Sequence, residues 1–127
     1  MFAAAISRWA ARLHGVTVER LYEVFPAALT DLEGVERTGV LTPIRSRTSF
    51  SGYAHRPRQL AAEARAAGLA VVSIVSVEGI AFALPDLDER LADELARRVV
   101  LDQARAIESV PELLGLGPHM ILTARVP

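Results

Sequence analysis

The stretch that most constrains the fold is residues 56–82, where a helix-forming segment leads into a run of β-branched residues. Pro57 suits the first turn of a helix, where its missing N–H costs nothing. Gly68 suits the left-handed position that follows a helix end. Between them, four residues at helical spacing form one apolar face: Leu60, Ala61, Ala64 and Ala67. The pattern predicts a helix that ends at Gly68 and feeds a strand at residues 69–77.

The predicted strand is apolar at almost every position. Its β-branched residues are Val71, Val72, Ile74, Val75 and Val77. A nearly continuous run of this kind favours a strand covered on both faces, as in a sheet between two layers of helices. A helix that leads into a buried strand is half of an α/β unit, so the sequence predicts the α/β fold class.

Other segments add one strand and one helix before this unit. Residues 2–6 are short and apolar, and they predict a strand. Residues 1–18 contain no acid and resemble an organelle presequence, but we prefer the strand. Thr17 is expected to cap a helix from Val18, which Pro26 kinks or splits.

Two more elements are predicted after the central unit. A second long helix begins near Pro85, with Asp86 or Asp88 as its cap. Its apolar face comprises Leu91, Leu95, Val99, Leu101 and Ile107. Residues 120–126 predict the final strand. The least regular segment, residues 34–54, holds several Gly, Ser, Thr and Arg residues and is either a lid or binding loop or a solvated connection.

Composition excludes several functions. The chain has 127 residues, which suits a single domain over residues 1–127. Its net charge of -1 gives no reason to expect nucleic acid or an anionic membrane as a partner, and no stretch is long enough to span a membrane. There is no Cys and no Lys, so thiolate chemistry and a Schiff-base lysine are excluded. The three His residues lie far apart, and we expect no metal site.

The candidate ligand-binding residues lie at strand ends and at one helix start. Ser7 and Arg8 follow the first strand, and Tyr53, His55 and Arg56 precede the central helix. Ligands of open α/β sheets bind beyond the carboxyl ends of parallel strands, and a helix N-terminus favours anions. His55 could act as a base near neutral pH. Alternatively, His55 and Arg56 simply cap the helix.

At these residues the chain resembles the C-terminal half of a class I S-adenosylmethionine-dependent methyltransferase. The resemblance is closest to the bacterial small-molecule branch that includes ubiquinone- and menaquinone-type enzymes. Residues 2–8 match the family's fifth strand and its exit, and residues 53–57 with Leu60, Gly68 and Leu69 match the following helix. Residues 75–79 match the end of the sixth strand, and residues 119–127 match the seventh.

The resemblance implies a partial Rossmann-like sheet of the last three strands, the final one inserted antiparallel, with flanking helices. It also implies that residues 7–54 help to cover a small-molecule methyl acceptor. Ser7, Arg8, Tyr53, His55 and Arg56 would then bind this acceptor, in a cytoplasmic protein. The family's acidic, Gly-rich cofactor loop has no counterpart in the sequence. We therefore expect this chain alone to bind no S-adenosyl-L-methionine and to be inactive by itself, and we assign no catalytic residue.

Three hypotheses follow. The chain is a truncated methyltransferase, from a misplaced start codon or a split gene. Alternatively, it is a stand-alone, non-catalytic binding or dimerisation module derived from that fold. In either case residues 2–6 would form an open sheet edge that pairs with a second copy or with an N-terminal partner chain. The third hypothesis is a small enzyme that uses His55 as its base.

Overall fold

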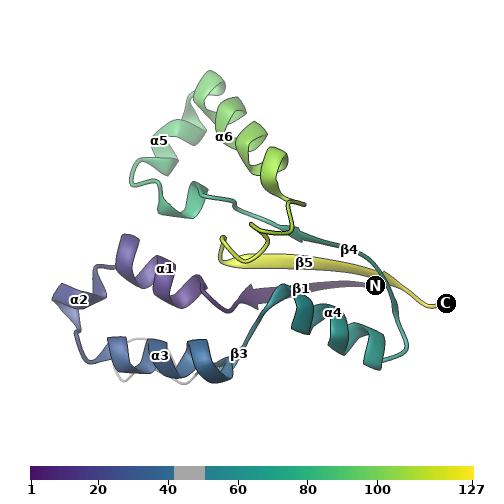
Figure 1. The fold of residues 1–127 in the computed structure, drawn as a ribbon. Coiled ribbons are helices and arrows are strands. Elements are labelled where there is room, and N and C mark those ends of the chain that lie inside the picture. Colours follow the sequence, from purple (N-terminus) through teal and green to yellow (C-terminus); the bar gives the residue numbers. More distant parts are fainter. Residues whose placement is uncertain (42–50) are drawn as a thin grey trace.

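The computed structural model describes residues 1–41 and 51–127, whose path is shown in Figure 1. Within this part of the chain, one five-stranded mixed sheet has the order β2-β3-β1-β5-β4. The strands are β1 (Phe2–Ser7), β2 (Val40–Leu41), β3 (Gly52–His55), β4 (Ala70–Ser76) and β5 (His119–Arg125). The helices are α1 (Ala10–Thr17), α2 (Leu21–Val24), α3 (Ala28–Thr38), α4 (Pro57–Ala66), α5 (Leu87–Ala92) and α6 (Glu94–Ile107), with a 3-10 turn at Ala81–Ala83.

The last strand, β5, lies antiparallel between β1 and β4. Ala5 of β1 pairs with Met120, and Ile74 of β4 pairs with Leu122. This is the arrangement that the resemblance implied for three strands. The sheet is larger than expected, however, because β3 pairs in parallel with the end of β1 and β2 pairs with β3. The α/β class is confirmed.

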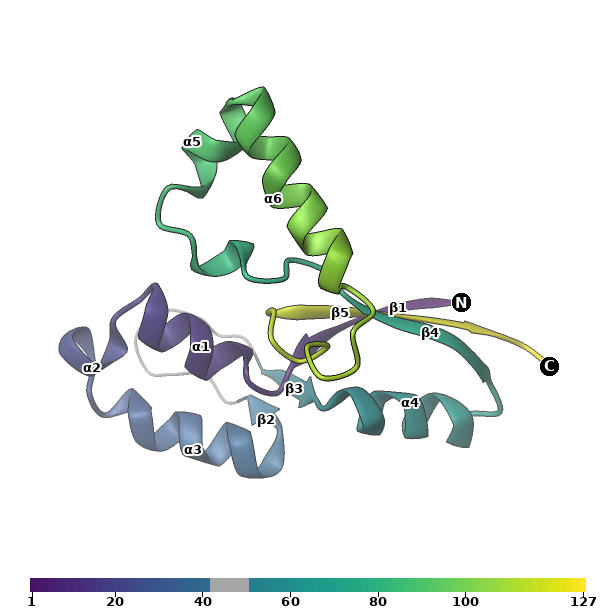
Figure 2. The same cartoon turned by 45° about the horizontal axis from the view of Figure 1, so that its top comes forward.

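Helix α4 covers one face of the sheet with Leu60, Ala61 and Ala64 of its predicted apolar face, whereas Ala67 is exposed beyond the end of the helix. Leu60 and Ala64 pack with residues of β1 and β5, namely Ala5, Met120, Leu122 and Ala124. Gly68 has a φ of 79° and ends this helical segment, as predicted. The pair formed by α5 and α6 lies on the other side of the sheet from α4 (Figures 1 and 2).

The prediction that residues 69–77 form a strand covered on both faces was wrong. The strand β4 is the last in the sheet order, and Val72 is 61% exposed. A register shift between Val71 and Ser73 interrupts its pairing with β5. An apolar, β-branched run favours a strand of either kind, because strand preference depends mainly on what packs around it.

The helices before β2 depart from prediction in their boundaries. Pro26 does separate two helices, since α2 ends at Val24 and α3 begins at Ala28. Thr17 is the last residue of α1 and not a cap, because its hydroxyl donates to the Leu13 carbonyl oxygen over 2.6 Å.

The segment expected to be irregular, residues 34–54, forms a helix end and two strands in the part that the structure describes. Helix α3 continues through Gly34 to Thr38, and β2 and β3 follow. Residues 42–50, the middle part of the predicted lid or binding loop, lie outside the described residues.

The predicted long helix after Pro85 is two helices. Asp93 ends α5 and caps α6, because its Oδ1 accepts a hydrogen bond of 2.7 Å from the Ala96 N–H. Asp86 stands before α5 but makes no capping bond. The predicted apolar face was also wrong in part, since Leu95 and Val99 are exposed while Val100 is buried. No helix in the described ranges is long and apolar enough to cross a bilayer.

Candidate functional site

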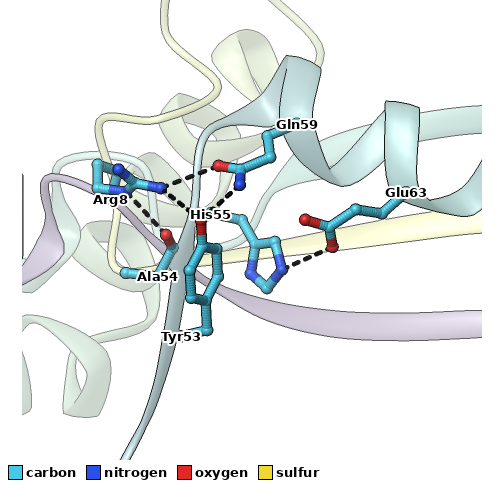
Figure 3. A network of polar contacts seen from close by, with 6 residues as sticks. All are labelled: Arg8, Tyr53, Ala54, His55, Gln59 and Glu63. Carbon is cyan, nitrogen blue, oxygen red and sulfur yellow. Dashed lines mark hydrogen bonds and ion pairs between the residues drawn. The ribbon is translucent and has the colours of Figure 1, made fainter. Parts of the chain in front are cut away.

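The residue that follows β1, Arg8, is buried at the junction of β1, α3, β3 and α4. It is 4% exposed, and its Nε donates to the Ala54 carbonyl oxygen over 2.8 Å. Its Nη1 donates to the Glu36 carbonyl oxygen over 3.2 Å, and its Nη2 donates to Gln59 Oε1 over 2.9 Å. The Tyr53 hydroxyl accepts a fourth bond, of 3.2 Å. Figure 3 shows the contacts of Arg8 with Ala54, Gln59 and Tyr53.

Within the described part of the chain, every oxygen that accepts a hydrogen bond from Arg8 is uncharged, and no carboxylate contacts its guanidinium. None of the ion pairs found among the described residues includes Arg8. Glu36 offers its backbone carbonyl to Arg8, while its carboxylate pairs with Arg12. That carbonyl belongs to the last turn of α3, where unpaired carbonyls and the helix dipole favour a cation. Arg8 therefore closes the C-terminus of α3 and does not face an open site.

Gly39 makes this arrangement possible. Its φ is 84°, and a Cβ there would lie 2.5 Å from Arg8 Nη2 and 2.8 Å from the Ala54 carbonyl oxygen. Its N–H donates to the Val35 carbonyl oxygen and ends α3. Only a residue without a side chain fits both the left-handed backbone and the close approach of Arg8.

Tyr53 and His55 lie beside Arg8 on β3. The two rings meet edge to face, with centroids 4.8 Å apart. The Tyr53 hydroxyl accepts bonds from both Arg8 and Gln59. His55 Nε2 lies 3.0 Å from Glu63 Oε2, and its Nδ1 is buried with no partner among the described residues. One ring nitrogen is thus engaged and the other is covered, which leaves neither open to an incoming substrate.

The other two predicted site residues lie apart from this network. Ser7 is buried, and its hydroxyl donates to the Gly115 carbonyl oxygen over 2.8 Å. Arg56 is exposed at the N-cap position of α4 and makes no side-chain cap there. The structure therefore brings together Arg8, Tyr53 and His55 and adds Gln59 and Glu63. These last two were missed, although their i+4 spacing on one face of α4 was a usable signal.

A groove of about 420 Å³ opens beyond the carboxyl end of β1. Its walls come from the start of α1, the first residue of α4 and the turns before β5. The lining residues are Trp9, Arg12, Leu13, Pro57, Pro111, Glu112, Leu113, Gly115 and Leu116. The volume lies within the usual range for small-molecule sites, and the walls are mainly apolar. Sequence analysis placed a ligand at this end of the sheet but did not identify the groove residues.

Arg12 supplies the main positive group of the groove. Its guanidinium forms an ion pair with the Glu36 carboxylate. The hydrogen bonds that Arg12 donates to the Glu36 carboxylate raise the pKa of Arg12 above its ordinary value. The residue is therefore fixed as a cation at the edge of an apolar groove.

The turns before β5 do not resemble a cofactor loop. A Cβ on Gly117 would lie 3.1 Å from Ser76 Oγ, 3.2 Å from the Gly79 carbonyl oxygen and 3.3 Å from Glu78 Oε2. The Glu78 carboxylate also pairs with the ring of His119 and accepts from its backbone N–H. The backbone at Gly117 is thus in close contact with its own chain. The sequence matches no protein-family model and no curated protein.

Proposed function

We propose that this chain is the acceptor-side part of an S-adenosylmethionine-dependent methyltransferase fold of the bacterial small-molecule type. The observation that carries the proposal is the placement of β5 antiparallel between the parallel strands β1 and β4, with a groove beyond the carboxyl end of β1. Ligands of α/β sheets bind at this end. The cytoplasmic location expected from the sequence belongs to the same proposal.

The groove supports an apolar, ring-bearing methyl acceptor. Trp9 offers an aromatic surface, and Leu13, Leu113 and Leu116 add aliphatic walls. Such walls bind a planar ring by dispersion and area burial. Arg12 at the edge suits a phenol or enol oxygen. The chain's contribution to methyl transfer is to hold and orient the acceptor, which is a large part of catalysis when two reactants must meet.

The methyl donor requires a complementary cofactor-binding half in this proposal, because the sequence has no counterpart of the family's acidic, Gly-rich cofactor loop. The open edge of β1 is the proposed place for that half. Met1 and Ala124 exchange both backbone hydrogen bonds, and the Ser7 N–H donates to the Pro118 carbonyl oxygen. In an antiparallel ladder, the groups of Phe2 and Ala4 then point away from β5. On that side of β1, only Ile6 and Ser7 pair with β3. The expectation of an open edge over the whole of residues 2–6 is therefore corrected at Ile6.

Fluorescence of Trp9 tests the proposal directly, because Trp9 is the single tryptophan of the chain. Titration with 1-naphthol is expected to change its emission in a saturable manner, while S-adenosylmethionine is expected to leave it unchanged. The variant Leu113→Glu places a charge in the groove and should abolish the naphthol response. Arg56→Ala, outside the groove, should keep it. A missing naphthol response, or a saturable response to S-adenosylmethionine, would contradict the proposal.

A second candidate function is a stand-alone binding or dimerisation module that pairs through the same edge. The observation in its favour is the outward-facing backbone of Phe2 and Ala4, with the Phe2 side chain 79% exposed. Ala4→Pro removes an outward N–H but leaves the bonds of Ala3 and Ala5 to β5. If this second function is the correct one, light scattering should show a dimer for the unaltered chain and a monomer for Ala4→Pro. A dimer that persists in Ala4→Pro would refute pairing at this edge.

A further inference from the structure

Helix α6 carries two apolar faces, of which only one is covered. Val100 is buried beneath the helix. Leu95 and Val99 lie four residues apart, and residues at that spacing share a face. They are 69% and 61% exposed. Full burial of each side chain would contribute about 1.5–3 kcal/mol, so this face favours a partner.

The charges along α6 identify the partner. The helix begins with Asp93 and Glu94, while its later turns carry Arg97, Arg98 and Arg105. The local ion pairs, Glu94 with Arg98 and Asp102 with Arg105, join side chains that are all more than 60% exposed. Such pairs are weak, and these charges remain able to interact with a neighbour. An antiparallel copy of α6 centred on Leu95 and Val99 would place Glu94 of each copy within about one helical turn of the partner's Arg98, and it would also oppose the helix dipoles.

We propose that α6 packs antiparallel against the α6 of a second copy across a two-fold axis, with Leu95 and Val99 at the centre. The interface is isologous, so the same stripe serves both partners. It lies on the helix pair α5–α6, away from the β1 edge. The inference therefore stands independently of methyl transfer.

Sedimentation equilibrium of the full chain tests this interface. The unaltered chain is expected to be dimeric, and Val99→Glu to raise the dissociation constant at least about 100-fold, because two valines leave the interface and two like charges meet. Val72→Glu is the matched control, since Val72 is also 61% exposed but lies on β4. It should leave the dimer unchanged, as should Ala4→Pro. Leu95→Ser, which introduces no charge, gives a second test, and circular dichroism checks the fold of each variant.

Charge reversal tests the antiparallel orientation. Glu94→Arg and Arg98→Glu should each weaken the dimer, and the double variant should restore it, because the contact between Glu94 and the partner's Arg98 is then reversed on both sides. A monomeric unaltered chain would overturn the proposal. So would equal effects of Val99→Glu and Val72→Glu, dissociation by Ala4→Pro alone, or a double variant weaker than both single ones.

Discussion

Arg8 donates from its Nε to the carbonyl oxygen of Ala54 over 2.8 Å, and this bond ties the exit of β1 to the middle of β3. The remaining nitrogens of Arg8 reach α3 and α4. One buried side chain thus joins four elements, β1, α3, β3 and α4, which come from three separate parts of the sequence. The role of Arg8 is to hold these four elements together and so to support the groove.

Replacing Arg8 by lysine should destabilise the chain strongly. Lysine keeps the charge but has no planar fork, so several of the four acceptors lose their donor in a buried place. We expect the free energy of unfolding to fall by about 2–4 kcal/mol. Urea denaturation followed by circular dichroism measures it. Arg56→Lys, at an exposed position without a side-chain cap, should change it by less than about 0.5 kcal/mol. Equal effects would refute the role assigned to Arg8.

Alanine substitutions at two glycines, one inside α3 and one directly after it, should have opposite effects on the free energy of unfolding. Gly39→Ala places a methyl group against Arg8 in a left-handed backbone and should lower the free energy of unfolding by at least about 1–2 kcal/mol. Gly34→Ala lies inside the helix with nothing within 4 Å of the new Cβ. It should raise the stability by about 0.5–1 kcal/mol. Thermal denaturation of both variants checks the signs, and a neutral Gly39→Ala would contradict the close packing around Arg8.

Two histidines should adopt opposite neutral tautomers. His55 places Nε2 at the Glu63 carboxylate, which only accepts, so its proton belongs on Nε2. His119 places Nδ1 at the Glu78 carboxylate, so its proton belongs on Nδ1. Nitrogen-15 NMR of the two rings at alkaline pH distinguishes these forms. Glu63→Ala should leave His55 as a mixture of tautomers and His119 unchanged. Finding the same tautomer for both rings in the unaltered chain would disprove the assignment.

The break between α5 and α6 should depend on Asp93. Asp93→Ala removes the acceptor of the Ala96 N–H and should cost about 1 kcal/mol of helix stability. Hydrogen exchange should then be faster in the first turn of α6. Asp86→Ala makes the same chemical change at a position that caps nothing, and it should leave exchange in α6 unaltered. Unchanged exchange in Asp93→Ala would show that the cap is dispensable.

Local signals correctly predicted that a helix and then a strand form the central unit. Pro57 and Gly68 bound α4 as expected, because each acts through its own backbone geometry. The environment of Val72 could not be predicted in the same way, since a β-branched residue suits a covered strand and an edge strand alike. Gly39 and Asp93 carried usable signals for a helix end and a helix start, which sequence analysis missed.

Sequence analysis predicted a site at the strand ends but not the contacts that its residues make. Arg8 was expected to face an acceptor because it follows a strand, but its acceptors on Glu36, Ala54 and Gln59 come from distant segments. Their convergence depends on the tertiary fold, which no local pattern specifies. The groove residues Trp9 and Leu113 likewise meet only when the turns before β5 close over the start of α1.

The DNA upstream of the codon for Met1, read together with an immunoblot of the native product, tests the central claim most directly. The proposal predicts an in-frame or adjacent reading frame that encodes an apolar strand, an acidic Gly-rich loop and a helix. It also predicts that the native cell holds either a longer product or a second chain that copurifies with this one. Unrelated upstream sequence, with a native product of this length and no such partner, would contradict the account.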